Sequence, residues 1–209
     1  MEYFQTNSAD STYQGISFKI IGKLLTNDPT VKTVANIGCG FAYYDGLLAE
    51  KHQNRKFYGF DFNDDLEEEN EINAKRGVKF ISGYPLANIM ESERRFDIVY
   101  FTSCASTIRN IELHKYLEIL SKKTKYVLFS EPIYPDPCGN SIDPDSVNVH
   151  DSIPVFCQRD TYDNIFGYLC FVHNYREIAE FYGYKTIEYS VKKYKCGPYW
   201  WITYLAKKE

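Results

Sequence analysis

Residues 33–42 read TVANIGCGFA and are the most informative stretch of the chain. The first five residues are mostly apolar and run straight into a glycine-rich turn, which is typical of a buried parallel strand. Residues 44–51 behind the turn have a helical pattern. Glycine lets the backbone turn tightly and approach a ligand closely, because it has no Cβ. This order predicts a nucleotide-like ligand at the switch point of an open α/β sheet.

Strands and helices alternate on both sides of this stretch. A helical stripe runs before it from Ile16 to Leu25 and closes near Asn27-Asp28-Pro29. Further strands are predicted at residues 56–60, 78–81, 96–101 and 126–129, with helices at 63–77 and 110–123 between them. Five strands separated by helices predict a parallel sheet with right-handed crossovers.

The pattern changes after Glu131-Pro132. Residues 133 to about 154 are rich in Pro, Asp, Asn and Ser, and a loop this long in a compact domain is usually functional or disordered. A helix is then predicted at 175–182, followed by strands at 185–191 and 200–206. The tight turn Lys195–Pro198 between them makes these two strands antiparallel. We therefore expect one domain, residues 1–209, with an α/β fold of seven strands, a mostly parallel sheet and an antiparallel C-terminal hairpin.

The bulk properties exclude several classes of function. A formal net charge of −4 without a long basic run disfavours a nucleic-acid partner, because phosphate contacts need a basic face. The six cysteines are widely spaced, which predicts reduced thiols and no metal site. No apolar run approaches the ~20 residues of a membrane span, and the first ten residues lack signal-peptide features. We expect a cytoplasmic protein with a small-molecule substrate.

A second signal lies 23 residues beyond Gly38, where the strand at 56–60 runs into Asp61. An acid at this place can accept both hydrogen bonds of a ribose diol. The next two predicted strands end in Ile81-Ser82-Gly83-Tyr84 and Phe101-Thr102-Ser103-Cys104. Because parallel strands end at the same edge of a sheet, these groups are expected to border one crevice.

Taken together, the glycine turn, Asp61 and the terminal hairpin resemble the class I S-adenosylmethionine-dependent methyltransferases, and among them bacterial small-molecule and sugar O-methyltransferases. The resemblance implies a Rossmann-like sheet with helices on both faces and S-adenosylmethionine as the cofactor. In that family the glycine turn meets the methionine part of the cofactor and the acid holds the ribose. The cofactor-binding residues that we expect are Asn36, Gly38, Cys39, Gly40, Asp61, Phe62, Gly83, Tyr84, Thr102 and Ser103.

The chain departs from the family pattern at three positions. Asn36 stands where the family usually has Asp or Glu, so it can form hydrogen bonds but carries no charge for the cofactor's ammonium group. Ala42 replaces a frequent third glycine, and Tyr84 replaces an Asp that often reads the adenine amino group. We therefore expect the adenine to be held mainly by stacking and backbone contacts, with Phe62 and Tyr84 as candidates.

Methyl transfer to a hydroxyl needs a group that removes a proton, and a histidine suits this role. His173 is the preferred catalytic candidate, because residues 171–177 resemble a His-Asn-Tyr motif of bacterial methyltransferases associated with sugars. Asn174 can equally be a helix N-cap, and His173 a structural imidazole. His150, with Asp151 beside it, is the second candidate. Glu131 is expected to face the crevice, where it would contact the substrate or close the pocket.

The acceptor site is expected to lie under late and N-terminal segments. Residues 1–30 would form a helical cap, and residues 133–170, with Tyr3, Phe4 and Tyr13, a lid. The fourth strand lacks the Asn/Asp-Pro-Pro-aromatic ending of enzymes that methylate nucleobase or glutamine nitrogens, which favours a small polar acceptor such as a sugar hydroxyl. The alternatives are an N-methyltransferase of a small amine, a non-catalytic interaction module, and an NAD-dependent oxidoreductase, which Tyr43 disfavours because it leaves G-x-G-x-x-G incomplete.

Overall fold

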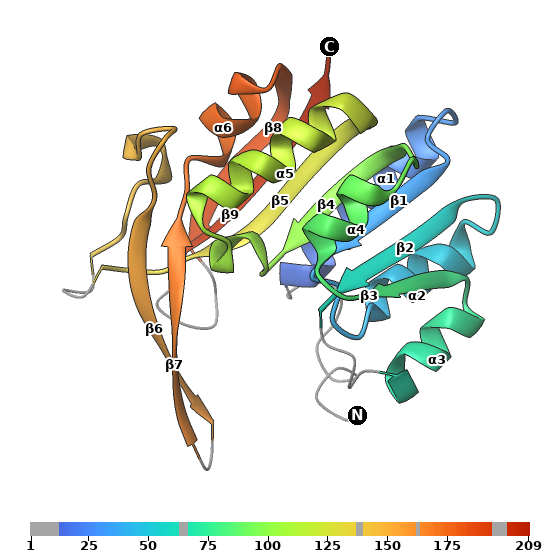
Figure 1. Cartoon of the computed structure of the whole chain (residues 1–209), viewed down its shortest axis with the longest axis horizontal. Coiled ribbons are helices and arrows are strands. Elements are labelled where there is room, and N and C mark those ends of the chain that lie inside the picture. The colour runs from blue at the N-terminus through green and yellow to red at the C-terminus, as the bar shows by residue number, and fades with distance from the viewer. Residues whose placement is uncertain (1–12, 63–66, 137–139, 162–163, 194–199) are drawn as a thin grey trace.

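The computed structural model describes residues 13–62, 67–136, 140–161, 164–193 and 200–209. Seven strands form one sheet in the order β3-β2-β1-β4-β5-β9-β8 (Figure 1). They are β1 (Thr33–Ile37), β2 (Lys56–Asp61), β3 (Val78–Ser82), β4 (Phe96–Thr102), β5 (Thr124–Ile133), β8 (Tyr184–Lys193) and β9 (Trp200–Lys208). The first five are parallel, and β9 is antiparallel to both β5 and β8. The predicted fold class is confirmed.

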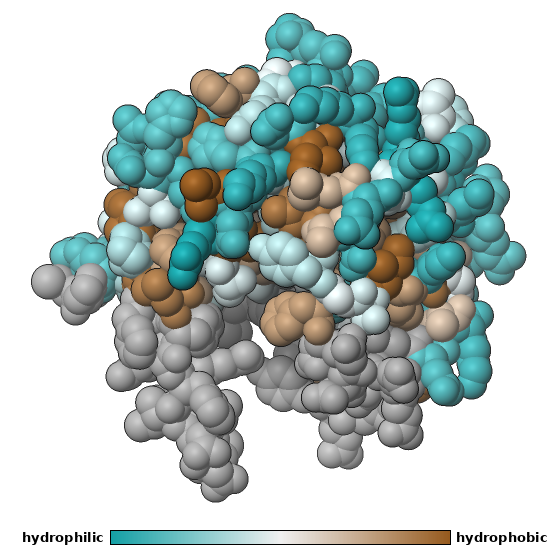
Figure 2. Space-filling view, in the orientation of Figure 1, coloured by the Kyte–Doolittle hydropathy of each residue, from teal (hydrophilic) through white to brown (hydrophobic). Residues whose placement is uncertain are grey.

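Helices cover both faces of this sheet (Figure 1). One face carries α1 (Tyr13–Asn27), α2 (Tyr43–Lys51) and α3 (Glu67–Lys75), and the other carries α4 (Pro85–Glu91), α5 (Asn110–Lys123) and α6 (Tyr175–Phe181). Figure 2 shows the face of α4, α5 and α6 as largely hydrophilic, with small separate hydrophobic patches. Scattered patches of this kind are ordinary on a folded domain.

The alternation of side chains along β1 explains why its sequence is apolar throughout. Val34 packs with Ile21 of α1 and Leu48 of α2 in one core cluster. Ala35 and Ile37 point the other way, into the cluster that contains the inner side chains of α5. A strand covered on both faces needs apolar residues at successive positions, and this is the pattern that identified β1 in the sequence.

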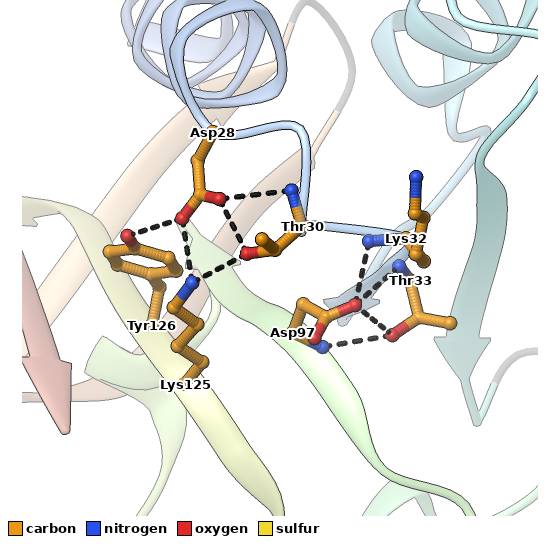
Figure 3. Close-up of polar contacts among 7 residues, drawn as sticks. All are labelled: Asp28, Thr30, Lys32, Thr33, Asp97, Lys125 and Tyr126. Carbon is orange, nitrogen blue, oxygen red and sulfur yellow. Dashed lines mark hydrogen bonds and ion pairs between the residues drawn. The ribbon is translucent and has the colours of Figure 1, made fainter.

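Two carboxylates form hydrogen bonds between neighbouring elements at the edge of the sheet where the parallel strands begin (Figure 3). Asp28, which follows α1, accepts hydrogen bonds from Lys125 Nζ at 2.7 Å and Tyr126 OH at 2.8 Å, both on β5. Lys125 contributes most to lowering the pKa of Asp28. On β4, Asp97 accepts hydrogen bonds from the backbone N–H of Lys32 at 2.7 Å and of Thr33 at 2.9 Å. These contacts connect β1, β4 and β5 at the end opposite to the predicted site.

The structure corrects the predicted strands in the second half of the chain. β5 extends to Ile133, well beyond the predicted end at residue 129, because β9 pairs with it throughout. Two further strands, β6 (Ile153–Thr161) and β7 (Asn164–Val172), form a separate antiparallel ribbon, so the expected tally of seven strands holds for the main sheet alone. Short helices η3 (Ala105–Thr107) and η4 (Pro144–Ser146), together with α4, also went unpredicted.

The ribbon projects away from the sheet in Figure 1, and its base is anchored in the core. Val155, Cys170 and Val172 at this base are buried, and β7 packs beside η3. The predicted cap at Asn63, the Lys195–Pro198 turn and the lid residues Tyr3 and Phe4 lie outside the described residues. None of the helices in the described part of the chain is both long and apolar enough to cross a bilayer.

Candidate active site

Backbone conformations that L-residues rarely adopt gather where the parallel strands end. The turn after β1 has positive φ at Gly38 (68°), Gly40 (50°) and Ala42 (46°). The segment after β3 has Gly83 at 101°, and the one after β4 has Ser103 at 54°. Such conformations are enriched at functional sites, because the surrounding structure must hold them in place. The structure therefore brings the sequence-predicted cofactor segments to one edge.

Hydrogen bonds join the turn after β1 to the end of β2. The N–H groups of Gly38 and Cys39 donate to the carbonyl oxygen of Phe60 at 2.8 and 3.1 Å. Gly40 N–H donates to Asp61 Oδ2 at 2.8 Å. The glycine turn and the acid, which are separate motifs in the sequence, thus form one unit in the fold.

The loop after β4 packs against the same turn. A Cβ on Gly38 would lie 2.4 Å from Cys104 Sγ and 2.7 Å from Cys104 Cβ, so only glycine fits here. A Cβ on Gly40, in contrast, would meet no atom of the described residues within 4 Å. Within the described part of the chain, the backbone at Gly40 is therefore open to a ligand.

Exposed aromatic rings surround this edge. Phe62 after β2 is 75% exposed and Tyr84 after β3 is 54% exposed. Phe41 and Tyr43, in and after the turn that follows β1, are exposed as well. The hydroxyl of Tyr84 donates to Glu112 Oε1 at 3.2 Å, which leaves its ring face out of the core. Aromatic faces beside a half-exposed Asp61 carboxylate fit a ligand that carries a ribose and a purine.

Beneath the turn lies a buried polar group that sequence reasoning missed. Asp45 of α2 is 2% exposed and accepts hydrogen bonds from Asn36 Nδ2 at 2.8 Å and from the Tyr100 hydroxyl. Burial raises the pKa of Asp45 to about 6. Asn36 Oδ1 is buried and has no partner in the described part of the structure. An acid in the first turn of a helix is common for dipole reasons, so nothing in the sequence distinguished Asp45.

Glu131, at the end of β5, holds the loop after β4. Its Oε1 accepts from the N–H groups of Cys104 and Ala105, both at 3.1 Å, and its Oε2 from that of Ser106 at 3.2 Å. The side chain is fully buried, and this burial raises its pKa to about 7 although the three N–H groups lower it. Glu131 therefore caps η3 and fixes the shape of the loop that contains the predicted residues.

Thr102 and Ser103 begin this loop. The Thr102 hydroxyl lies 2.9 Å from the hydroxyl of Ser17, so α1 contacts the same edge of the sheet. Ser103 N–H donates to the carbonyl oxygen of Ser130 on β5 at 3.1 Å. Both predicted residues are thus held by neighbouring elements at the edge where the parallel strands end.

His173 is completely buried beside this loop. Its Nε2 lies 2.9 Å from the carbonyl oxygen of Ile108, and its Nδ1 lies 3.3 Å from Asn110 Oδ1. Burial lowers the pKa of the imidazole to about 4, so the ring is neutral at physiological pH. Asn174 is the N-cap of α6, because its side chain accepts a hydrogen bond from Glu177 N–H at 3.1 Å. This agrees with the alternative in the sequence analysis that Asn174 is a helix N-cap.

His150 lies in a different environment. Its exposed side chain stacks on His114 of α5, with ring centroids 5.8 Å apart, and meets the edge of Phe181 of α6 at 5.6 Å. Its ring contacts among the described residues are therefore with helices α5 and α6 and not with the loops after β1 to β4. The two histidines do not form one site.

The fold is similar to that of solved methyltransferase structures. An S-adenosylmethionine-dependent methyltransferase from Clostridium acetobutylicum ATCC 824 superposes with a TM-score of 0.63 at 15% identity, over 96% of this chain and 93% of that one. Magnesium protoporphyrin IX methyltransferase (ChlM) from Synechocystis PCC 6803 with bound SAM gives 0.61 at 13% identity, over 94% and 80%. The N-terminal domain of EvdMO1, crystallised in the presence of SAH and D-fucose, gives 0.60 at 10% identity, over 92% and 82%.

The amino-acid sequence itself matches no protein-family model and no curated protein. The assignment therefore depends on the sheet order, with its antiparallel β9 between β5 and β8, and on the structural similarity. The chain has the fold of the class I S-adenosylmethionine-dependent methyltransferases.

Proposed function

We propose that the protein is an S-adenosylmethionine-dependent methyltransferase that acts on a small polar acceptor. The observation that carries this proposal is the hydrogen bond from Gly40 N–H to Asp61 Oδ2, because it joins the glycine turn to the acid that we expect to bind the ribose. Ligands of open α/β sheets bind in the crevice at this edge. The similar structures described as containing SAM or SAH support the same cofactor.

The residues at this edge fit the cofactor. Asp61 would accept hydrogen bonds from the ribose hydroxyls, and the exposed rings of Phe62 and Tyr84 would lie against the adenine. The turn from Gly38 to Gly40 would adjoin the methionine part, since no described residue covers its backbone at Gly40. When bound, S-adenosylmethionine supplies an electrophilic methyl group on a sulfonium. The protein then has to hold the acceptor atom in line with that methyl group and exclude water.

We propose that the ribbon β6–β7 and the segment from Ile133 to Ser152 form the acceptor pocket. The ribbon base is buried beside η3, next to the loop after β4. An isolated two-stranded ribbon is only marginally stable, so its projection from the sheet suits a part that closes over a substrate. A hydroxyl of a sugar or glycoconjugate remains the acceptor that we favour, and the EvdMO1 domain whose structure was determined in the presence of SAH and D-fucose is in keeping with this choice.

One observation favours an amine acceptor as the second candidate. His173 is the preferred sequence candidate for the general base, yet its ring is fully buried and both nitrogens lie close to protein oxygens. Transfer to a neutral amine needs no strong base. We therefore propose that His173 positions Ile108 and Asn110 beside the loop after β4. Methyl-labelled cofactor offered with a panel of sugars and a panel of small amines separates the two acceptors.

Calorimetric titration with S-adenosylmethionine tests the cofactor. Asp61→Ala should weaken binding by about 10-fold to 100-fold, because charged hydrogen bonds to the ribose are lost. Asp61→Asn keeps an acceptor for Gly40 N–H and should weaken binding less. Glu50→Gln, on the exposed side of α2, is the matched control and should bind normally. Absence of wild-type binding at cofactor concentrations on the order of 1 mM would refute the proposal.

A further inference from the structure

The buried carboxylate of Asp45 is surrounded by neutral groups. Its carboxylate has two hydrogen-bond donors, Asn36 and Tyr100, and both donors are neutral. Within the described part of the chain, no lysine, arginine or histidine forms an ion pair with it. A buried carboxylate without a cation is costly and is normally paired. The structure thus contains a buried negative charge that lacks a positive partner, directly beneath the turn after β1.

Asn36 connects this charge to the turn. An ionised carboxylate only accepts hydrogen bonds, so Asp45 orients the Asn36 amide with Nδ2 toward itself. The other end of the amide, Oδ1, is then a buried acceptor without a described partner. Asn36 is the last residue but one of β1 and stands two positions before Gly38. A single positively charged donor would satisfy both the orphan oxygen and the charge behind it.

The negative charge of Asp45 also acts on a residue of the turn itself. Cys39 is the central residue of Gly38-Cys39-Gly40, and its thiol pKa is raised by burial first and then by the charges of Asp45 and Asp61. Two carboxylates thus act on the turn, one from α2 and one from the end of β2. A glycine turn before a helix otherwise suits an anionic phosphate, and this field opposes such a ligand.

We propose that Asp45, acting through Asn36, is a specificity-determining residue that makes the turn after β1 prefer the positively charged end of its ligand. The inference rests on the proposed function, because the methionine part of S-adenosylmethionine carries an ammonium, a sulfonium and a carboxylate and so has a net positive charge. Its product, S-adenosylhomocysteine, keeps the ammonium and the carboxylate but loses the sulfonium charge, which leaves this part neutral overall. Asp45 thereby favours the substrate form of the cofactor over the product form.

Three adenosyl ligands separate this role from a general effect on binding. S-adenosylmethionine has both cationic groups, S-adenosylhomocysteine has one, and methylthioadenosine has neither but keeps the ribose and adenine. Calorimetric titration of wild type, Asp45→Asn and the control Glu50→Gln with each ligand is the experiment. Asp45→Asn should lose about tenfold in affinity for S-adenosylmethionine, as expected for one charge acting across a protein interior, and should lose less for S-adenosylhomocysteine. Affinity for methylthioadenosine should stay within about twofold.

The outcomes distinguish a failure of the proposed function from a failure of the proposed role of Asp45. If wild type binds none of the three ligands, the proposed function fails. If wild type binds them and Asp45→Asn weakens all three equally, or none, the function stands and the role of Asp45 is refuted. A thermal unfolding scan shows whether the variant folds.

A pH titration of the wild type gives the same answer without a variant. The carboxylate of Asp45 faces Asn36 on β1, Tyr100 on β4 and Cys39 in the turn, and the raised pKa values of Tyr100 and Cys39 keep both groups neutral. Among the described residues, no charged side chain of α1, α3, β2 or β3 contacts it. Affinity for S-adenosylmethionine relative to methylthioadenosine should therefore fall as the pH drops below about 6. A constant ratio would overturn the proposal.

Discussion

Replacing Gly38 by alanine adds one methyl group where the turn after β1 meets the loop after β4. The new Cβ would stand 2.4 Å from Cys104 Sγ and 2.7 Å from Cys104 Cβ. Cys104 has little freedom to retreat, because its backbone N–H is held by Glu131. The φ angle of 68° at Gly38 adds a second cost, since a side chain is disfavoured there. The left-handed backbone costs about 1–2 kcal/mol and the overpacking about 1–3 kcal/mol, so we expect Gly38→Ala to lower the free energy of unfolding by about 2–5 kcal/mol.

Gly40→Ala is the matched control, because Gly40 has a similar φ of 50° but no atom of the described residues within 4 Å of its Cβ position. It should cost only the backbone part, about 1–2 kcal/mol. Urea denaturation followed by circular dichroism measures both variants, and the m-value should stay unchanged. Adding Cys104→Ala to Gly38→Ala removes the closest atom and should recover part of the loss as a coupling of about 0.5–3 kcal/mol. Equal stability of Gly38→Ala and Gly40→Ala would show that Cys104 does not exclude a side chain at residue 38.

Three further substitutions test the charged and buried groups. Asp28→Asn should lower the free energy of unfolding by about 1–3 kcal/mol at neutral pH. Because Lys125 lowers the pKa of Asp28 in the folded state, this loss should become smaller below about pH 4, and urea denaturation at neutral pH and below pH 4 measures it. Glu131 has a raised folded pKa of about 7, so the wild type should lose stability relative to Glu131→Gln as the pH rises from about 5 to 8, and a constant difference would contradict this. His173→Ala should lower the free energy of unfolding by about 2–4 kcal/mol, whereas unchanged stability with abolished turnover would instead support proton transfer by His173.

The parts of the fold that were predictable are those in which local signals agree. The β1 pattern, the glycine turn after it and the basic residues that close α5 each depend on neighbours a few positions away. The structure reproduces β1 at Thr33–Ile37 and α5 at Asn110–Lys123 as predicted. The positions of the glycine turn and of Asp61 were also predicted correctly, because both lie at the ends of successive parallel strands.

The buried polar contacts could not be predicted, because their partners are far apart in the sequence. Tyr100 and Asp45 are 55 residues apart, and Glu131 lies 25 to 27 residues from the N–H groups that it accepts from. Each acid alone has an ordinary local explanation, as a helix-start residue or a strand end. The ribbon β6–β7 was missed for a related reason, because its two strands depend mainly on each other and lack the regular alternation of a strand packed on a core.

The edge where the parallel strands begin contributes to stability, and the edge where they end is the proposed binding site. At the edge where the parallel strands begin, Asp28 and Asp97 are paired with donors and contribute to stability. At the opposite edge, two features oppose stability. Ala42 and Ser103 have positive φ angles, which side chains disfavour, and burial raises the pKa values of the Asp45 and Glu131 carboxyls. A ligand that supplies a cation to Asp45 would relieve part of this cost, and any ligand that binds only the folded state also stabilises it. Ligand binding can therefore add most stability at the edge that contains Asp45 and Glu131. The paired carboxylates Asp28 and Asp97 at the other edge help the free protein to tolerate this strain.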